Sequence, residues 1–336
     1  MSNEILSTLL LEYDQKKRRA ELDLERKKLN LYNSIPRLQE IENELNNFAI
    51  NTAKMILKGS PASIDELNNK VIQLKTEKEQ LLKDNNIPSN FLEPNYECSI
   101  CKDTGYIQLE NSASTLCSCL KQKLLDISYN KSNISNLCKE NFNTFRPDIF
   151  SDLIEPEKNK MNISPRQNIL AIKQKCINFV ENFDNPHTHN LLFTGNTGLG
   201  KTFMSNCIAN ELIKKGKNVL YQTAPVLLET VIDNKMSKYK NASQDNFYKN
   251  VLEADLLIID DLGTECLNSM KLSELFTILN TRLLNLNNKV TKTIISTNLN
   301  INNIFKIYEE RIGSRIAGFY DIYYFFGDDL RFKNKK

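Results

Sequence analysis

The sequence contains no tryptophan and almost no excess of charge of either sign. Its 44 Lys and Arg residues are nearly balanced by 41 Asp and Glu residues, which leaves a net charge of +3 over 336 residues. So small an imbalance does not indicate a nucleic-acid partner, and any surface for such a partner has to be local. The chain is rich in Lys, Asn and Ile, and we interpret this, like the missing tryptophan, as compositional bias rather than function.

Long apolar runs are missing as well. The longest early stretch, Ile5–Leu11, is interrupted by Ser7 and Thr8 and is too short to cross a membrane. No secretory signal is recognisable, so we expect a cytoplasmic protein with no membrane partner. In a reducing compartment the eight cysteines favour metal ligation over a disulfide framework. The length allows more than one domain.

The closely spaced cysteines predict a zinc site. Cys98 and Cys101 form a C-x-x-C pair, and Cys117 with Cys119 forms a C-x-C pair. Four thiolates in two close pairs are typical of a tetrahedral structural Zn²⁺ site, which leaves no open position for water. Cys138 is an alternative ligand. A thioredoxin-like redox pair is the competing interpretation, disfavoured because two pairs are present without a surrounding βαβ pattern.

The region before these cysteines, residues 1–93, is predicted to be helical. Apolar residues recur at 3–4 spacing over 38–55 and again over 64–81, which indicates two amphipathic helices. Gly59-Ser60-Pro61 separates them and favours an antiparallel hairpin, and Ser63 with Glu66 resembles a capping box. A helical region without a catalytic constellation is best interpreted as a module that binds a partner.

A complete phosphate-binding loop lies near the middle of the chain. It follows an apolar run, precedes a plausible helix and reads Gly195-Asn196-Thr197-Gly198-Leu199-Gly200-Lys201-Thr202. The pattern G-x-x-x-x-G-K-T between a strand and a helix predicts that backbone N–H groups cradle phosphate. Lys201 is expected to reach the β- and γ-phosphates of ATP, and the Thr202 hydroxyl is expected to hold Mg²⁺.

Residues 166–336 alternate between helical and strand patterns, which predicts an α/β domain with a parallel sheet flanked by helices. The expected strands are the run before the loop and residues 219–223, 256–259, 293–297 and 323–326. The ten residues after Phe326 are too few for a separate helical lid. We assign residues 94–125 to the zinc segment and 126–165 to a linker, whose Phe142, Phe145 and Phe150 are expected to lie against the next domain.

Acidic and amide side chains follow two of the expected strands. Asp260 and Asp261 come directly after the apolar run 256–259, and in a phosphate-loop fold we expect that strand beside the loop. Asp260 is then placed to hold Mg²⁺, and Asp261 to orient or deprotonate the attacking water. The alternative is a pair of solvated turn residues. Asn298 ends the next strand, where its amide could position water or contact the γ-phosphate.

Several motifs together resemble the bacterial replicative-helicase loaders of the DnaC/DnaI type, within the AAA+ ATPases. They are GNTGLGKT at 195–202, LLIIDDLGTE at 256–265, STN at 296–298, ERIGSR at 310–315 and GDDLR at 327–331. The resemblance covers about 166–336, and the cysteine segment is similar to that of loader-like proteins with a zinc-bearing N-terminal region.

The resemblance implies an AAA+ phosphate-loop ATPase core without a lid and a role for each matching residue. It implies that Asp260 is the Mg²⁺-side acid, Asp261 the catalytic acid, Asn298 the first sensor, Arg311 the arginine acting in trans on a neighbouring subunit, and Arg331 the second sensor. Many AAA+ proteins carry Glu where this chain has Asp261.

The expected function is ATP-dependent placement of the replicative DNA helicase on single-stranded DNA, with ATP binding and hydrolysis as a switch. The expected partners are the helicase, single-stranded DNA and further copies of the chain. One alternative is a transposition helper ATPase of the IstB type, which shares nearly all of these motifs. Another is a non-catalytic coiled-coil and zinc adaptor, which the intact Lys201, Thr202 and Asp260 disfavour.

Two basic regions are candidates for contact with single-stranded DNA. Lys235, Lys238, Tyr239 and Lys240 combine positive charge with an aromatic ring on which a base could stack. A solvated helix end is the equally weighted alternative. The basic runs at 16–19 and 26–28 form the second region, although interleaved acidic residues favour a solvated helix face there.

Overall fold

The computed structural model describes residues 2–58, 64–108, 114–128, 140–159, 161–236, 242–284 and 290–335. Its contacts separate two compact units, one of residues 7–115 and one of residues 1–6 with 116–336. Among the described residues, no helix is long and apolar enough to cross a membrane.

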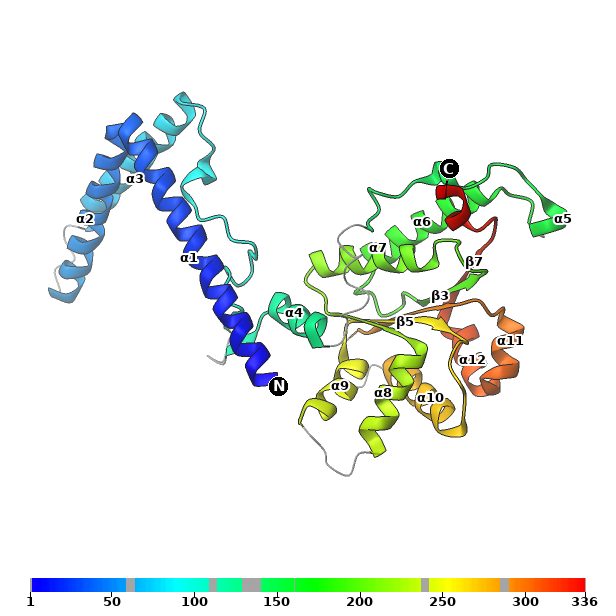
Figure 1. The fold of residues 1–336 in the computed structure, drawn as a ribbon. Helices are drawn as coiled ribbons and strands as arrows, with labels where there is room; N and C mark the ends of the chain where they lie inside the picture. Colours follow the sequence, from blue (N-terminus) through cyan, green and yellow to red (C-terminus); the bar gives the residue numbers. More distant parts are fainter. Residues whose placement is uncertain are drawn as a thin grey trace. The chain divides into compact units, whose positions relative to one another are not determined.

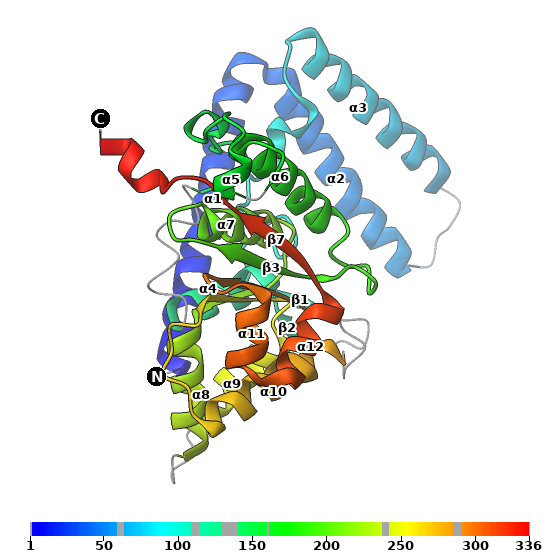
Figure 2. The same cartoon turned by 90° about the vertical axis from the view of Figure 1, so that its right-hand side faces the viewer.

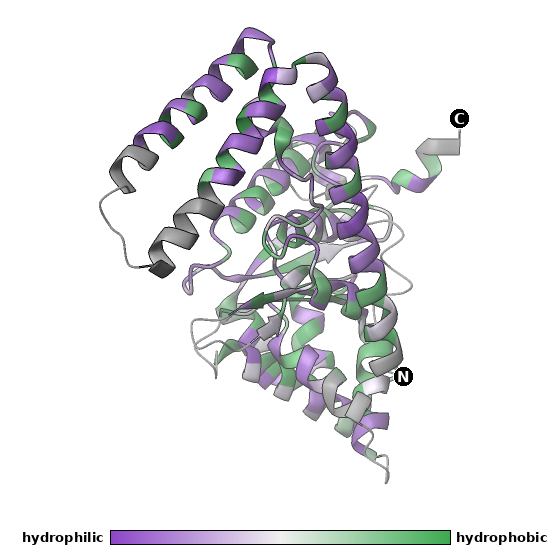
Figure 3. Ribbon diagram, turned by 90° about the vertical axis from the view of Figure 1, so that its left-hand side faces the viewer, coloured by the Kyte–Doolittle hydropathy of each residue, from purple (hydrophilic) through white to green (hydrophobic). Residues whose placement is uncertain are grey.

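The unit of residues 7–115 is mainly helical. Its elements are α1 (Ser2–Ser34, whose first residues belong to the other unit), α2 (Pro36–Lys58), α3 (Ile64–Asp84), η2 (Ser89–Leu92), β1 (Tyr106–Gln108) and β2 (Ser114–Leu116, where the boundary falls). Hydrophilic residues predominate along the middle of α1 (Figure 3). The buried side chains of Leu31, Leu38 and Leu82 form a small core among these helices. Helical structure in this region is therefore confirmed.

The α2 and α3 helices lie side by side in opposite directions (Figure 1). Arg37, near the start of α2, donates to both carboxylate oxygens of Glu77, near the end of α3, at 2.8 and 3.1 Å. Lys78 donates to Glu42 at 2.8 Å. The predicted antiparallel pairing is confirmed, while its turn, with Gly59-Ser60-Pro61 and Ser63, lies outside the described residues.

The larger unit is built on a five-stranded sheet in which every pairing is parallel. Its strands are β3 (Asn190–Gly195), β4 (Val219–Thr223), β5 (Leu256–Leu262), β6 (Lys292–Thr297) and β7 (Tyr320–Phe325). Its helices are α4 (Ser118–Ser128), η4 (Pro147–Ile149), α5 (Pro156–Asn159), α6 (Pro165–Glu181), α7 (Lys201–Lys214), α8 (Ala224–Met236), α9 (Ala242–Glu253), α10 (Ser269–Leu283), α11 (Ile301–Ile307), α12 (Glu309–Phe319) and η5 (Leu330–Lys335). The predicted parallel sheet flanked by helices is confirmed.

Helices cover both faces of this sheet. The α6 and α7 helices lie on one face, and α8 to α12 lie on the other (Figure 1). Successive residues of β5 alternate between the two cores, with Ile258 packed on the α6–α7 side and Ile259 on the opposite side. Strands covered on both faces are typically apolar at successive positions, which explains the uninterrupted apolar run at the start of β5.

The order of the strands corrects one expectation. The sheet runs β4-β5-β6-β3-β7, so β6 lies between the strand that carries Asp260 and the strand that leads into the phosphate loop. β5 is therefore not beside the loop. The other neighbour of β3 is β7 (Figure 2). β7 begins at Tyr320, three residues before the predicted start, and α11 and α12 occupy a region where no helices were predicted.

Aromatic residues in the described part of the linker pack on the larger unit as predicted. Phe142 and Phe145 pack against the core on the α6–α7 side, and Phe150 is buried within it. At the sheet's edge, the Gln122 side chain of α4 pairs with the backbone of Val219, accepting from its N–H at 2.7 Å and donating to its carbonyl at 3.1 Å. The side-chain amide thus satisfies backbone groups that an edge strand would otherwise leave unpaired.

Candidate nucleotide site and cysteine cluster

The phosphate loop joins β3 to α7, and its glycines are required by its geometry. Gly200 precedes the helix with φ of 91°, a left-handed conformation that favours glycine. A Cβ on Gly198 would collide with the carboxylate of Asp329. The Leu330 N–H donates to the Gly198 carbonyl at 3.0 Å, so residues after β7 are tied to the loop. The N-terminus of α7, with its unpaired N–H groups, follows directly.

Lys201 is buried beneath this loop at 6% exposure. Its ammonium donates to the carbonyls of Gly195 and Asn196 at 2.6 and 2.7 Å and to Asn298 Oδ1 at 2.8 Å. Burial lowers the pKa of Lys201, and the carboxylates of Asp261 and Asp260 partly oppose that shift. The structure thus brings the lysine and the amide after β6 together, 97 positions apart in sequence.

Asp260 is the centre of a buried hydrogen-bond network. Its Oδ2 accepts from Thr202 Oγ1 at 3.1 Å and from the Tyr221 hydroxyl, while Oδ1 accepts from Ser296 Oγ and from the Asp261 N–H. Carboxylate and hydroxyl oxygens are ligands that Mg²⁺ prefers. Thr202 and Asp260 therefore fit a magnesium ion, although Thr202 lies on the helix that follows β3 and Asp260 lies on β5, and these two strands are not neighbours in the sheet.

Tyr221 and Ser296 are residues that the sequence analysis missed. Burial raises the pKa of the Tyr221 hydroxyl and the adjacent Asp260 carboxylate raises it further, so the hydroxyl remains a donor at neutral pH. Ser296 is fully buried on β6. Each strand carries further polar residues, such as Gln222 on β4 and Thr297 on β6, so no sequence signal singles these two out.

Asp261 is exposed at a point where the end of β5 is irregular. The pairing register with β6 shifts between Ile259 and Leu262, and Asp261 has φ of 55°. Such a bulge re-aims a side chain, and Asp261 is exposed while Asp260 and Leu262 are buried. Partial burial raises the pKa of Asp261, the charge of Asp260 adds to the rise, and Lys201 opposes it.

A mainly apolar cavity of about 250 Å³ adjoins the loop. It is lined by Thr144, Phe145, Arg146, Ile149, Phe150, Ile169, Gly200, Phe203, Met204 and Leu330. Aromatic and aliphatic walls next to phosphate-binding N–H groups suit the flat base of a nucleotide. Linker residues supply half of this lining, a contribution that their weak periodicity did not indicate.

The two arginines implied by the resemblance lie in different settings. Arg331 is exposed and pairs with Asp329, donating through Nε at 3.1 Å and through Nη2 at 2.8 Å. It is near enough to Lys201 to lower the pKa of that ammonium. Arg311, on α12, is exposed, donates to Glu309 at 2.9 Å and lies 5.1 Å from the Phe276 ring centre.

The four expected zinc ligands form a cluster. The Sγ atoms of Cys98, Cys101, Cys117 and Cys119 all lie within 4.8 Å of one another. In a tetrahedral site with Zn–S bonds of about 2.3 Å, the sulfurs are about 3.8 Å apart, so the donor set and its spacing fit Zn²⁺. Cys138 lies outside the described residues.

Asp103 holds the first half of this cluster. Its buried carboxylate accepts from the N–H groups of Glu97 and Cys98, each at 2.9 Å. The Lys102 N–H donates to the Cys98 carbonyl at 2.9 Å, which closes the turn between the first two cysteines. Two cysteine pairs in one cluster favour a metal site over an isolated redox pair.

The candidate DNA contacts are only partly described. Lys235 donates to both oxygens of Glu274 at 2.6 and 2.7 Å, so its charge is already compensated within the fold. Lys238, Tyr239 and Lys240 lie outside the described residues. In the basic runs of α1, Arg18 pairs with Asp14 at 3.0 Å, which favours the interpretation of a solvated helix face.

Comparison with known proteins agrees with this geometry. Residues 166–312 match the model of the IstB-like ATP binding protein family. The DnaC replicative helicase loader of Escherichia coli is 26% identical over 142 residues, which cover 42% of this chain and 55% of that protein. The chromosomal replication initiator protein DnaA of Campylobacter jejuni is 34% identical over 126 residues, or 37% of this chain and 26% of that protein. The chain thus spans from about a quarter to about half of the length of these relatives.

Among solved structures, the DnaC helicase loader has a TM-score of 0.44 at 21% identity, covering 57% of this chain and 99% of that chain. The DnaI structure has the same score and identity, covering 57% of this chain and 94% of that chain. Residues 166–312 therefore resemble the IstB-like ATP binding protein family, and the sequence similarity to a DnaC-type helicase loader is confirmed.

Proposed function

We propose that this chain is an Mg²⁺-dependent ATPase that helps to place a replicative DNA helicase on single-stranded DNA. The observation that carries the ATPase part is the convergence of Lys201, Thr202, Asp260 and Asn298 at one end of the sheet. These residue types are those that bind and hydrolyse nucleoside triphosphates in phosphate-loop proteins.

Each side chain has a distinct task in this proposal. When ATP binds, the Lys201 ammonium leaves the loop carbonyls and binds the β- and γ-phosphates. Thr202 and Asp260 hold the metal. Mg²⁺ supplies neutralising charge on the phosphates when it is bound. Asp261, which is exposed beside the network, orients or deprotonates water, and Asn298 senses the γ-phosphate. The apolar cavity next to Gly200 receives the base.

The helicase part of the proposal rests on similarity to the Escherichia coli protein named a replicative helicase loader. In this proposal the helical region and the zinc segment bind the helicase, and ATP binding favours the state that is bound to the helicase and DNA. Hydrolysis then favours release, because a ligand shifts an equilibrium only by binding its two states differently. Copies of the chain assemble so that Arg311 of one completes the site of the next.

The second candidate is a transposition helper ATPase. The family whose model matches residues 166–312 is named after an IstB-like protein, which favours this candidate specifically. A non-catalytic adaptor is the third, and the geometry around Lys201 argues against it because a degenerate site would not need to retain its metal-binding acid and hydroxyl.

Capture from lysate tests the proposal directly. The full chain is immobilised and exposed to lysate with ATP and without it. Lys201→Ala, which is expected not to bind ATP, serves as the matched variant. We expect the helicase to be retained by the wild-type chain, more strongly with ATP, and expect Lys201→Ala to lose ATP binding and the ATP-dependent gain while keeping its fold.

The same experiment separates the rivals. Capture of a transposase in place of a helicase supports the IstB-type role. Absence of ATP hydrolysis by the wild-type chain, at normal ATP affinity, supports the adaptor. An ATP affinity of Lys201→Ala within about threefold of wild type contradicts the assignment of the site itself.

A further inference from the structure

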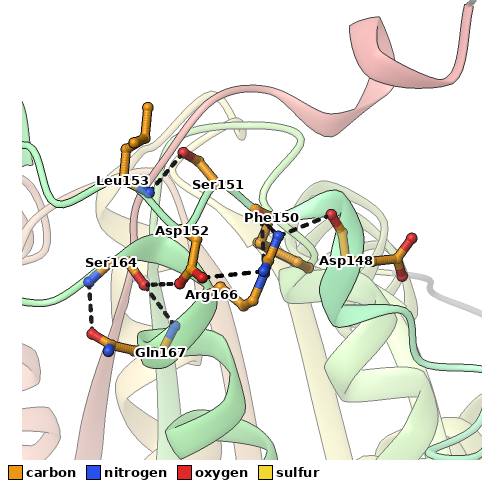
Figure 4. Close-up of polar contacts among 8 residues, drawn as sticks. All are labelled: Asp148, Phe150, Ser151, Asp152, Leu153, Ser164, Arg166 and Gln167. Carbon is orange, nitrogen blue, oxygen red and sulfur yellow. Dashed lines mark hydrogen bonds and ion pairs between the residues drawn. The ribbon is translucent and has the colours of Figure 1, made fainter.

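A group of polar side chains at the start of α6, centred on Arg166 and Ser164, forms hydrogen bonds with a stretch of the linker (Figure 4). We call this group the bracket. The guanidinium of Arg166 donates to the Phe150 carbonyl through Nε at 3.2 Å and through Nη2 at 3.1 Å, and Nη2 also lies 3.4 Å from the Asp148 carbonyl. Its Nη1 donates to Asp152 Oδ2 at 3.2 Å. One side chain thereby binds three points along residues 148–152, which we name the strap.

Further hydrogen bonds hold the bracket together. Asp152 Oδ1 accepts from Ser164 Oγ at 3.1 Å, and Ser164 is the buried cap of α6, accepting in turn from the Gln167 N–H. The Arg166 N–H donates to the Ser151 carbonyl at 3.0 Å. Because the planar guanidinium presents several donors in a fixed fork, a single ammonium cannot reproduce this set of bonds.

The strap forms a wall of the cavity beside the phosphate loop. Ile149 and Phe150 line that cavity, and Phe150 is only 6% exposed. A Cβ on Gly200 would lie 3.8 Å from Phe150 Cζ, so the ring is in van der Waals range of the loop. Arg166 is not among the residues that line the cavity, so any effect it has on a ligand there passes through the strap.

We propose that Arg166 is a positioning residue for base recognition: it fixes the strap so that Phe150 and Ile149 form the wall against which the nucleotide base packs. This inference rests on the proposed binding of ATP. The phosphates are bound by Lys201 and the loop, which Arg166 does not touch. Loss of Arg166 therefore weakens the contribution of the base to ATP affinity and leaves the contribution of the triphosphate unchanged.

The test compares two ligands that differ by the nucleoside. Affinities of the full chain for ATP and for inorganic tripolyphosphate are measured by calorimetry, with Mg²⁺ present throughout. For Arg166→Ala we expect the ATP affinity to fall about tenfold or more, with the tripolyphosphate affinity within about twofold of wild type. Arg166→Lys restores part of the ATP affinity because one ammonium can still bind the Phe150 carbonyl.

Lys175→Ala is the matched control. Lys175 is exposed on the same helix, and its replacement also removes one positive charge near the N-terminal half of the domain. We expect both affinities to remain at wild-type values. Thermal melting of every variant checks the fold. If Arg166→Ala does not fold, Phe150→Leu is measured in its place, because it alters the cavity wall directly and is expected to show the same selective loss of ATP affinity.

Four results would overturn the inference. Unchanged ATP affinity in folded Arg166→Ala would remove the positioning role. Equal losses for ATP and tripolyphosphate would assign Arg166 a general structural role instead. If the wild-type chain binds ATP no more tightly than tripolyphosphate, the base contributes nothing to binding and Arg166 has no base site to position. If the wild-type chain binds neither ligand, the proposed function is contradicted as well.

Discussion

Asp260 is a buried carboxylate, and burial of such a group is costly unless its oxygens accept hydrogen bonds. Ser296 and the Asp261 N–H satisfy one oxygen, while Tyr221 and Thr202 satisfy the other. The Tyr221 hydroxyl stays protonated because burial raises its pKa. Of these donors, only Thr202 belongs to the phosphate loop, so the other three hold the carboxylate in its orientation when a metal engages Thr202.

Replacement of Tyr221 by Phe tests this orienting role. We expect Tyr221→Phe to raise the Mg²⁺ concentration needed for half-maximal hydrolysis about tenfold, the lower end of the range for partners that orient a metal ligand. The physical reason is that Asp260 Oδ2 would retain only the hydrogen bond from Thr202. Magnesium titrations of ATP turnover measure the effect.

Tyr308→Phe is the control for that experiment. Tyr308 is an equally buried tyrosine whose hydroxyl donates to a carboxylate, in its case Glu265. Both variants lose a buried hydrogen bond and are expected to lose similar stability, on the order of 1–3 kcal/mol. A shift in the Mg²⁺ requirement of both variants, or of neither, would contradict a specific role for Tyr221.

Asp261 is the candidate for activating water. We expect Asp261→Asn to preserve ATP affinity and to slow hydrolysis about 10²-fold or more, as is typical when a general base is lost. Its exposure, at a bulge beside the buried Asp260, leaves its carboxylate accessible to a water molecule. Single-turnover hydrolysis with saturating ATP separates this chemical effect from binding.

Unchanged turnover of Asp261→Asn would assign the role to another acid. Glu265 is the next in sequence, yet its carboxylate accepts from the Gly263 N–H at 2.9 Å and from Tyr308. That environment suits a group that holds the loop after β5 rather than one that takes a proton. Hydrolysis that depended on Glu265 would therefore require these bonds to break first.

At the scale of elements, α4 links the second cysteine pair, Cys117 and Cys119, to the sheet. The helix begins at Ser118, between Cys117 and Cys119, and its Gln122 pairs with both backbone groups of Val219 on β4. The same strand carries Tyr221 two residues later, on the Asp260 network. Small segments such as that around the cysteines contain little core, so a bound metal supplies much of their folding free energy.

Zinc is expected at one ion per chain, bound by Cys98, Cys101, Cys117 and Cys119. Chelation should unfold the segment and weaken helicase capture while leaving the ATP affinity of the separate domain within about threefold of its starting value. Metal analysis of protein purified under reducing conditions, with circular dichroism before and after chelation, measures the result.

Cys117→Ser and Cys266→Ser form a matched pair for this prediction. Cys117 is a buried member of the cluster, whereas Cys266 is an exposed free cysteine outside it. We expect the first substitution to lose zinc and the second to retain it. Zinc-free wild-type protein, or equal zinc content in both variants, would remove the metal assignment.

At the scale of the whole molecule, Arg311 bears on assembly. Its guanidinium is exposed and contacts Glu309 and Phe276, both on the α10–α12 side of the domain. If it acts on a neighbouring copy, Arg311→Ala should bind ATP normally yet hydrolyse it about 10³-fold more slowly. Adding the Lys201→Ala variant should then restore activity, because one copy supplies the intact site and the other supplies the intact arginine.

Turnover measured across mixing ratios shows whether this occurs. Activity of the mixture equal to the sum of its parts would contradict a shared site. Arg315→Ala is the matched variant, since Arg315 lies on the same helix with its guanidinium 5.8 Å from the same ring centre. A loss confined to Arg315→Ala would transfer the role to that residue.

Much of the fold was predictable because its signals are local. The phosphate loop was identified from fixed spacing, β4 from Val219 to Thr223 was predicted to the residue, and the buried start of β5 was evident from its apolar run. The short α11 was missed because seven residues show too little periodicity, although Asn300, whose side chain accepts from the Asn303 N–H, is a recognisable cap.

The sequence by itself determined which chemical groups this chain carries and how near neighbours are spaced, since backbone geometry within a loop or a C-x-x-C turn depends on a few adjacent residues. Only the tertiary structure decided which distant groups meet. It inserted β6 between β5 and β3, brought Asn298 to Lys201, and added Tyr221 to the Asp260 network. Strand order depends on how the two cores pack on opposite faces of one sheet. That packing involves contacts between residues far apart along the domain, and a local sequence pattern carries no information about them.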